Sequence, residues 1–291
     1  MVADGHPRHA GAGFGGPRRM SVSVEAVALR HCEFEAKVKI AGSGSPVVYL
    51  HAAGGPVWDP FLDALAEHHR VYAPDHPGTG DTDRNAIHRV PTLWDLVLIY
   101  DELLDTLDLG GAALVGASFG AMVACEIAAH RRGAISALVL LDPIGLWRDD
   151  APVAQYMTMS PEELAATLFH DPQSPAAQAA LALPASNDER AVAMADLVWA
   201  MGATGKFVWP IPDKGLARRL HRVTAPTLVV WGAEDQLVSP IYAQEFADRL
   251  GDARIEIVAG AGHVPQLERL DMVAPMVLDF LAAGDGRPNA Q

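Results

Sequence analysis

A serine between two glycines is the residue of this sequence best suited to chemistry. Ser118 lies in a Gly-x-Ser-x-Gly pattern with Gly116 and Gly120, directly after an apolar run and before a helix-forming segment that Gly133 closes. A serine hydroxyl becomes a useful nucleophile when a sharp strand-to-helix turn exposes it beside a base and backbone N–H donors. Such a turn crowds the backbone two residues either side of the serine, where only glycine avoids a clash. The pattern predicts a nucleophile, with a surface serine in an ordinary turn as the alternative.

A serine nucleophile needs a histidine to take its proton and a carboxylate to orient that histidine. His263 lies in a glycine-rich loop just past the last predicted strand, and Asp235 directly follows another predicted strand. Asp142, at a third strand end, is the alternative carboxylate, whereas Glu234 is expected to be a solvated neighbour of Asp235. The chain order Ser118, Asp235, His263 differs from the orders in the chymotrypsin and subtilisin folds.

Strand-like and helix-like segments alternate, which predicts an α/β fold with a mostly parallel central sheet flanked by helices. A capping box at Thr92 predicts the start of one helix, and residues 270–281 predict a closing helix. Between 143 and 220 the alternation stops and only helical pieces remain, which indicates an inserted helical cap. The remaining core comprises residues 21–142 and 221–291. The predicted strands are residues 46–51, 70–75, 112–115, 137–142, 225–232 and 254–258.

Composition limits the partners of the protein. Half of the 291 residues are hydrophobic and the formal net charge is −14, which argues against nucleic acid or an anionic membrane as a partner, since either demands a basic face. No run reaches the roughly 18 apolar residues of a membrane-spanning helix. Cys32 and Cys125 suit a reducing cytoplasm. Residues 1–20 are expected to be a disordered leader, with Met20 as an alternative start.

No His/Cys group in the sequence shows metal-ligand spacing, and no phosphate loop or dinucleotide fingerprint is found. We therefore expect no cofactor and no metal. A small-molecule substrate is the expected partner, and the sequence leaves the oligomeric state open, a homo-oligomer included.

Four motifs occur in a specific order: His51-Ala-Ala-Gly-Gly after a strand, Asp75-His-Pro-Gly-Thr-Gly-Asp-Thr, the turn at Ser118, and the pair Asp235 and His263 in their glycine-bearing loops. Together they resemble the α/β-hydrolase superfamily, in its cap-bearing branch of esterases, lactonases and carbon–carbon bond hydrolases. The resemblance covers roughly residues 35–282, nearly the whole chain.

The resemblance implies a role for each matching residue. Ser118 is the nucleophile, His263 the general base and then acid, and Asp235 the orienting carboxylate. The backbone N–H groups of Phe119 and Ala53 form the oxyanion hole. Many relatives carry glycine where this chain has an alanine at position 52, and the added methyl group narrows the hole or changes which amide points inward.

Other polar residues of these motifs, His51 and Asp75, are expected to support the loops rather than to react. In the insertion, Trp199, Phe207 and Trp209 either line a substrate pocket or form the cap's own core.

The predicted function is hydrolysis of a carboxylic ester or lactone of a medium-sized, largely apolar molecule through an acyl-enzyme, because the insertion is rich in alanine, leucine and aromatic residues. The alternatives are carbon–carbon bond hydrolysis of a diketone-like substrate, which uses the same triad, and a non-catalytic member of the fold that only binds a ligand.

Overall fold

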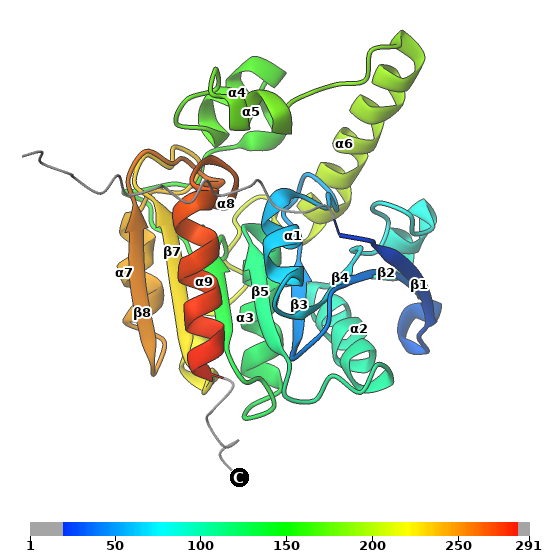
Figure 1. Cartoon of the computed structure of the whole chain (residues 1–291), viewed down its shortest axis with the longest axis vertical. Helices are drawn as coiled ribbons and strands as arrows, with labels where there is room; N and C mark the ends of the chain where they lie inside the picture. The colour runs from blue at the N-terminus through cyan, green and yellow to red at the C-terminus, as the bar shows by residue number, and fades with distance from the viewer. Residues whose placement is uncertain (1–19, 285–291) are drawn as a thin grey trace, which may run out of the picture.

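The computed structural model describes residues 20–284, so residues 1–19 of the expected leader lie outside the described part of the chain. Eight strands form one sheet in the order β1-β2-β4-β3-β5-β6-β7-β8 (Figure 1). Strand β2 pairs antiparallel with β1 and β4, and every other pair is parallel. The mostly parallel sheet is confirmed. The strands are β1 (Ser23–Ala28), β2 (Glu35–Ala41), β3 (Pro46–Leu50), β4 (Arg70–Pro74), β5 (Ala113–Ala117), β6 (Leu138–Leu141), β7 (Thr227–Gly232) and β8 (Ala253–Val258).

The central strands are buried along their whole length. Every residue of β5, β6 and β7 is buried, as expected for parallel strands covered on both faces, which read as continuous apolar runs. Strand β1 lies at the edge of the sheet and is exposed at all but one position. Its weak apolar pattern explains why the sequence did not predict it.

Helices cover both faces of the sheet (Figure 1). Helices α1 (Pro60–Ala66), α8 (Pro265–Glu268) and α9 (Leu270–Gly284) lie on one side. On the other side are α2 (Leu93–Thr106), α3 (Phe119–His130) and α7 (Ile241–Ala247). The buried apolar residues of these three helices form one hydrophobic cluster, and those of α1 and α9 form another. The predicted capping box of α2 is present: Thr92 Oγ1 accepts from the Asp95 amide, and the Asp95 carboxylate accepts from the Thr92 amide.

The cap is formed by α4 (Pro161–Leu168), α5 (Pro175–Ala180) and α6 (Asn187–Val208), which lie beyond one end of the sheet (Figure 1). Helix α6 is, among the described residues, the only helix that is long and apolar enough to cross a membrane. Its two halves differ: the first is almost entirely exposed, whereas Ala203, Phe207 and Val208 in the second half join the hydrophobic core.

Candidate active site

Ser118 lies in a strained turn between β5 and α3. Its φ of 52° and ψ of −111° are a backbone conformation that L-residues rarely adopt, and such strain is concentrated at functional sites. A Cβ atom added at Gly116 would lie 2.6 Å from the Ala121 backbone, and one added at Gly120 would lie 2.0 Å from the carbonyl oxygen of Leu50. Both glycines are therefore required by backbone contact.

The structure brings together Ser118, Asp235 and His263, of which the first and last are 145 positions apart in the sequence. The Ser118 hydroxyl lies 2.8 Å from Nε2 of His263, and Nδ1 of His263 lies 2.8 Å from Oδ2 of Asp235. All three side chains are buried, with 8% of Ser118 exposed. A neutral imidazole in this arrangement donates from Nδ1 to the carboxylate and accepts at Nε2 from the hydroxyl, which is the tautomer that a general base requires.

Asp235 is fixed by donors on both of its oxygens. Oδ1 accepts from the amides of Leu237 and Val238 at 2.8 and 2.9 Å, and Oδ2 accepts from the indole of Trp231 at 3.1 Å. Asp235 is thus held in position to orient His263.

Asp142, the alternative carboxylate, lies at the end of β6 and is completely buried. Its Oδ1 accepts from the Gly232 amide at 2.9 Å, and its Oδ2 has no partner among the described residues. Burial, and next the charge of Asp235, raise the pKa of Asp142 well above its usual range. Donor atoms of Asp142, Asp235 and His263 lie within 4.8 Å of one another, close enough for a metal ion, but both ring nitrogens of His263 are already bonded, Nδ1 to Asp235 and Nε2 to Ser118.

Two glutamates that sequence reasoning missed hold the loop of His263. Glu234, expected to be solvated, instead accepts from the amides of Gly260 and Ala261 at 2.9 and 3.0 Å. Glu268 accepts from the Gly262 amide at 2.6 Å and, with its other oxygen, from the amide of His170 in the cap. The expectation for Glu234 is wrong because the loop folds back onto its carboxylate. The only sequence signal was that Glu234 is next to Asp235 and that Glu268 follows His263 by five residues.

Two backbone amides are the candidate donors to an oxyanion. The Phe119 amide directly follows Ser118 at the start of α3, and the Ala53 amide lies in the loop after β3. The Thr204 hydroxyl of α6 lies 3.3 Å from the carbonyl oxygen of Ala53, but the shorter acceptor for its one proton is the carbonyl oxygen of Ala200 at 2.8 Å. These amides are the groups that the sequence assigned to the oxyanion hole.

A buried network lies behind the Ala53 loop. The amide of His76 donates to Nε2 of His51, while Nε2 of His76 donates to the carbonyl oxygen of His51. The Tyr100 hydroxyl is bonded to Nδ1 of His76. Burial lowers the pKa of His76 to about 4 and that of His51 well below its usual range. Both imidazoles are therefore neutral and hold the loop by hydrogen bonds.

The loop after β4 is held by Asp75. Its Oδ1 accepts from the ammonium of Lys39 at 2.6 Å and its Oδ2 from the Asp81 amide at 2.9 Å. Burial raises the pKa of Asp75 from its usual value. Its neighbours place Asp75 in a loop-supporting position.

Apolar cap residues contact the loops around Ser118. The ring of Phe207 stacks on that of Phe119, with centroids 6.2 Å apart. Cβ atoms at Gly54 and Gly55 would each be 3.5 Å from Leu197 and Ala200 respectively. Trp199 and Trp209 are 37% and 52% exposed, and the Trp199 indole donates to the Gly78 carbonyl. Of the three aromatic residues, only Phe207 packs beside Ser118's own helix.

The comparisons agree with this architecture. A sequence profile described as the Alpha/beta hydrolase family matches residues 47–276, which is most of the chain. The protein therefore belongs to the alpha/beta hydrolase family, and the resemblance and fold class expected from the sequence are confirmed.

Relatives within the family differ in what they do. The chain is 30% identical to polyketide synthase ThaQ of Burkholderia thailandensis over 84% of its own length, but it spans only 12% of that synthase. It is 28% identical to 2-hydroxymuconate semialdehyde hydrolase of Pseudomonas sp. (strain CF600), over 84% of this chain and 89% of that protein. The crystal structure of a bacterial membrane phospholipase A superposes with a TM-score of 0.75 at 22% identity, covering 91% of this chain and 87% of that one. This last likeness shows the fold alone.

Proposed function

We propose that the protein hydrolyses carboxylic esters or lactones through an acyl-enzyme formed on Ser118. The observation that carries the proposal is the continuous series of hydrogen bonds from the Ser118 hydroxyl through His263 to Asp235. A nucleophile, a base and an orienting carboxylate within hydrogen-bond reach are the parts that acyl transfer needs.

In the proposed reaction, the Ser118 oxygen attacks the carbonyl carbon of the substrate while its proton passes to Nε2 of His263. Asp235 stabilises the resulting imidazolium. The tetrahedral intermediate collapses when His263 returns that proton to the leaving alkoxide, which departs as an alcohol. A water molecule then attacks the acyl-serine, gives its proton to His263, and the acid leaves as Ser118 recovers its proton.

The negative charge of the tetrahedral intermediate requires fixed donors. The amides of Phe119 and Ala53 are the donors that we assign to it, and each such donor contributes roughly 3–4 kcal/mol to lowering the barrier. The place of Phe119 directly after Ser118, as the first residue of α3, supports its assignment.

An apolar acyl group suits the surroundings. Leu197, Ala200 and Phe207 are the cap residues packed at the loops beside Ser118. Nearby cap cations are bonded elsewhere: the Lys206 ammonium donates to two carbonyl oxygens before α2, and Arg219 forms a bidentate pair with Glu126. These contacts favour a neutral, largely apolar substrate of medium size.

Carbon–carbon bond hydrolysis of a diketone-like substrate is the second candidate. It is favoured by the relative named 2-hydroxymuconate semialdehyde hydrolase, which matches over 89% of its length. The same triad serves both reactions, but a carbon leaving group needs a conjugated carbonyl to accept its electrons. The cap residues packed against Gly54, Gly55 and Phe119 are apolar, and these contacts favour the ester reaction, which we therefore place first.

The test of the mechanism is labelling with a fluorophosphonate probe, followed by location of the adduct by mass spectrometry. We expect one adduct, on Ser118, and neither adduct nor ester turnover in the Ser118→Ala variant. Replacing Ser136, a serine outside the site, by alanine serves as the matched control. Ester turnover that survives Ser118→Ala would overturn the mechanism, and a protein that binds esters without turning them over would be a ligand-binding member of the fold.

The substrate class is tested by comparing kcat/KM for p-nitrophenyl esters of increasing acyl length, for lactones and for vinylogous diketones. We expect esters or lactones to exceed diketones, with the highest values at medium acyl length. Higher values for diketones would move the assignment to carbon–carbon bond hydrolysis while leaving the role of Ser118 intact.

A further inference from the structure

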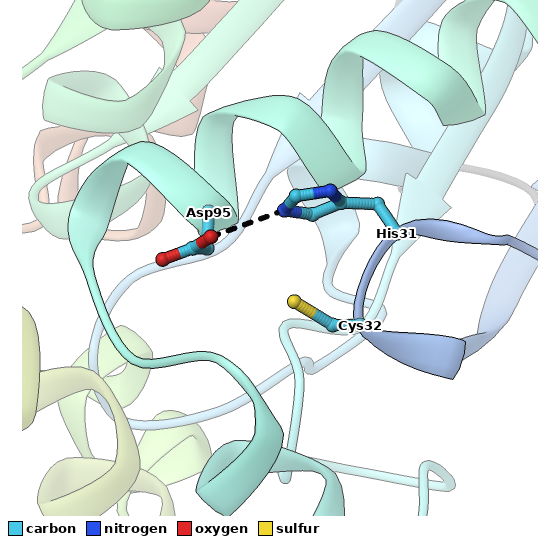
Figure 2. Close-up of side chains that lie close together, drawn as sticks. All are labelled: His31, Cys32 and Asp95. Atoms are coloured by element: carbon cyan, nitrogen blue, oxygen red, sulfur yellow. Dashed lines mark hydrogen bonds and ion pairs between the residues drawn. The ribbon is translucent and has the colours of Figure 1, made fainter.

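A second cluster of reactive side chains lies outside the candidate active site. His31 and Cys32 lie in the short helix η1 (His31–Glu33) between β1 and β2, and Asp95 lies in the first turn of α2 (Figure 2). Nε2 of His31 is 3.2 Å from Oδ1 of Asp95, and these two atoms and Sγ of Cys32 all lie within 4.8 Å of one another. We propose that these three side chains form a zinc-binding site.

The donor atoms are those that zinc prefers. Thiolate, imidazole and carboxylate are its usual protein ligands, whereas magnesium and calcium take oxygen ligands and disfavour sulfur. Bonds of about 2.0–2.3 Å in a tetrahedral geometry separate neighbouring ligand atoms by about 3.3–3.6 Å. The separation of 3.2 Å between His31 Nε2 and Asp95 Oδ1 is close to this value, and Cys32 Sγ lies within 4.8 Å of both atoms. Three protein ligands leave a fourth position for water.

Surrounding hydrogen bonds orient the proposed ligands. Oδ2 of Asp95 accepts from the amide and hydroxyl of Thr92, which leaves Oδ1 directed toward His31. The Glu102 carboxylate accepts from the amide of His31 at 2.8 Å, and the Arg89 guanidinium donates to the carbonyl oxygen of Cys32 at 3.2 Å. The Thr92 bonds fix the side chain of Asp95, as partners of metal ligands regularly do, whereas the Glu102 and Arg89 bonds hold the backbone of His31 and Cys32.

The backbone of η1 is held in an unfavourable conformation. Cys32 and Glu33 have φ values of 57° and 47°, in the left-handed region that residues other than glycine seldom occupy. In this conformation, the side chains of His31 and Cys32 both point into the space in front of Asp95 (Figure 2). The strain is therefore linked to the arrangement of the ligands, as is frequent at binding sites.

The site is open to solvent ions, because all three side chains are only half-buried. Burial and the charge of Asp95 raise the pKa of the free Cys32 thiol, against the opposing effect of Arg89 and Lys206. In the proposed binding step, zinc replaces the hydrogen bond between His31 and Asp95 and takes the Cys32 sulfur as thiolate. The thiol proton passes to solvent, and the Nε2 proton of His31 moves by way of solvent to Nδ1, so that Nε2 binds zinc through its lone pair. The ion would tie the turn between β1 and β2 to the start of α2. It would stabilise the folded chain as the zinc concentration rises.

The test uses the full chain and Co²⁺ as a spectroscopic probe for zinc. We expect one equivalent of Co²⁺ to produce a thiolate-to-cobalt charge-transfer band that Zn²⁺ then abolishes by displacement. Cys32→Ser should lose the band and weaken zinc binding by about 100-fold or more, since a direct ligand is lost. Cys125→Ser is the matched control, because Cys125 is buried in the core, and it should keep the band.

A second variant, Asp95→Asn, keeps an oxygen acceptor for Thr92 and removes the ligand charge. It should weaken zinc binding and reduce the rise in melting temperature that zinc gives the parent protein. The proposal is overturned if the parent chain shows no thiolate band, or if the band persists in Cys32→Ser. Metal bound without a thiolate band would place the ion on other histidines.

Discussion

The loops that carry the triad and the long cap helix α6 differ in how closely their backbones are packed. A Cβ atom added at Gly120 or Gly232 would lie 2.0 or 1.8 Å from a backbone carbonyl oxygen. In α6, a Cβ atom at Gly202 would meet nothing within 4 Å, and Val192 and Val198 are 60% and 65% exposed. Backbone contact fixes the loops of Ser118 and Asp235, whereas several positions along the cap helix have no neighbour beside them.

This difference in packing leads us to expect that substitutions near Ser118 affect the reaction rate and that substitutions in α6 affect substrate selection. Interiors are packed so closely that added atoms are felt at once, so a change near Ser118 moves the triad itself. A change along the exposed half of α6 has room to be accommodated and acts only on what enters the site. We expect the effects of substitutions to fall steeply from the triad loops to the cap.

The largest expected effect is that of Asp235→Asn. The asparagine amide carries no negative charge to stabilise protonated His263, and its NH2 group favours the tautomer whose proton is on Nε2. The kcat for ester hydrolysis should therefore fall by about 10⁴-fold. Asp142→Asn is the matched control and should leave kcat within about 10-fold, because Asp142 bonds to Gly232 instead of His263. Measured kcat values for the two variants decide the question, and the opposite ranking would make Asp142 the orienting carboxylate.

Gly232→Ala should come next. The added methyl group would lie 1.8 Å from the carbonyl oxygen of Gly262, next to His263, so that either β7 or the histidine loop must move. Overpacking of this kind costs about 1–3 kcal/mol or more. We therefore expect a loss of both unfolding free energy in urea and kcat. Unchanged values for both would show that the triad loops are less tightly constrained than the contacts indicate.

Asp142→Asn should also change how stability depends on pH. Because the pKa of Asp142 is raised in the folded protein, the folded state keeps a proton that the unfolded chain loses above the usual carboxyl pKa of about 3.9. The stability of the parent protein therefore declines as pH rises through the interval between these two pKa values, by up to about 1.4 kcal/mol per pH unit. Asparagine does not titrate and removes this decline.

The effect is measured by urea unfolding of both proteins at about pH 4 and about pH 7. The lower pH is close to the usual carboxyl pKa, and the higher pH lies well above it. As pH rises, the free energy of unfolding of Asp142→Asn should increase relative to that of the parent protein. Parallel pH profiles would mean that Asp142 is ionised in the folded protein.

The candidate site residues that the sequence predicted are those marked by a local sequence motif. Ser118 and Asp235 each follow a strand that is buried along its whole length and is recognised from its apolar composition. His263 follows the partly exposed strand β8 and was found from its glycine-rich loop. Glu234 and Glu268 were missed because they act through backbone amides of a folded loop, and no residue type marks those amides in advance.

The cluster of His31 and Cys32 with Asp95 escaped for a related reason. Spacing rules find metal ligands only where the ligands are close in sequence, and Asp95 lies 64 positions from His31. The edge strand β1 was not predicted either, since it buries only one of its residues. Contacts between segments far apart in the sequence determine the positions of β1 and of this cluster, and the local sequence gives little indication of such contacts.

The smallest expected effect is that of Gly202→Ala, and it is opposite in sign to that of Gly232→Ala. Gly202 lies inside α6 with an exposed, unobstructed Cβ position, and alanine in a helix interior is more stable than glycine by about 0.5–1 kcal/mol, largely through the unfolded chain. Thermal melts should show a small rise, with kcat for short esters unchanged. Because both substitutions add the same methyl group, their difference measures packing alone. A destabilising Gly202→Ala would mean that a second molecule or a ligand covers this part of α6, and that the cap is as constrained as the core.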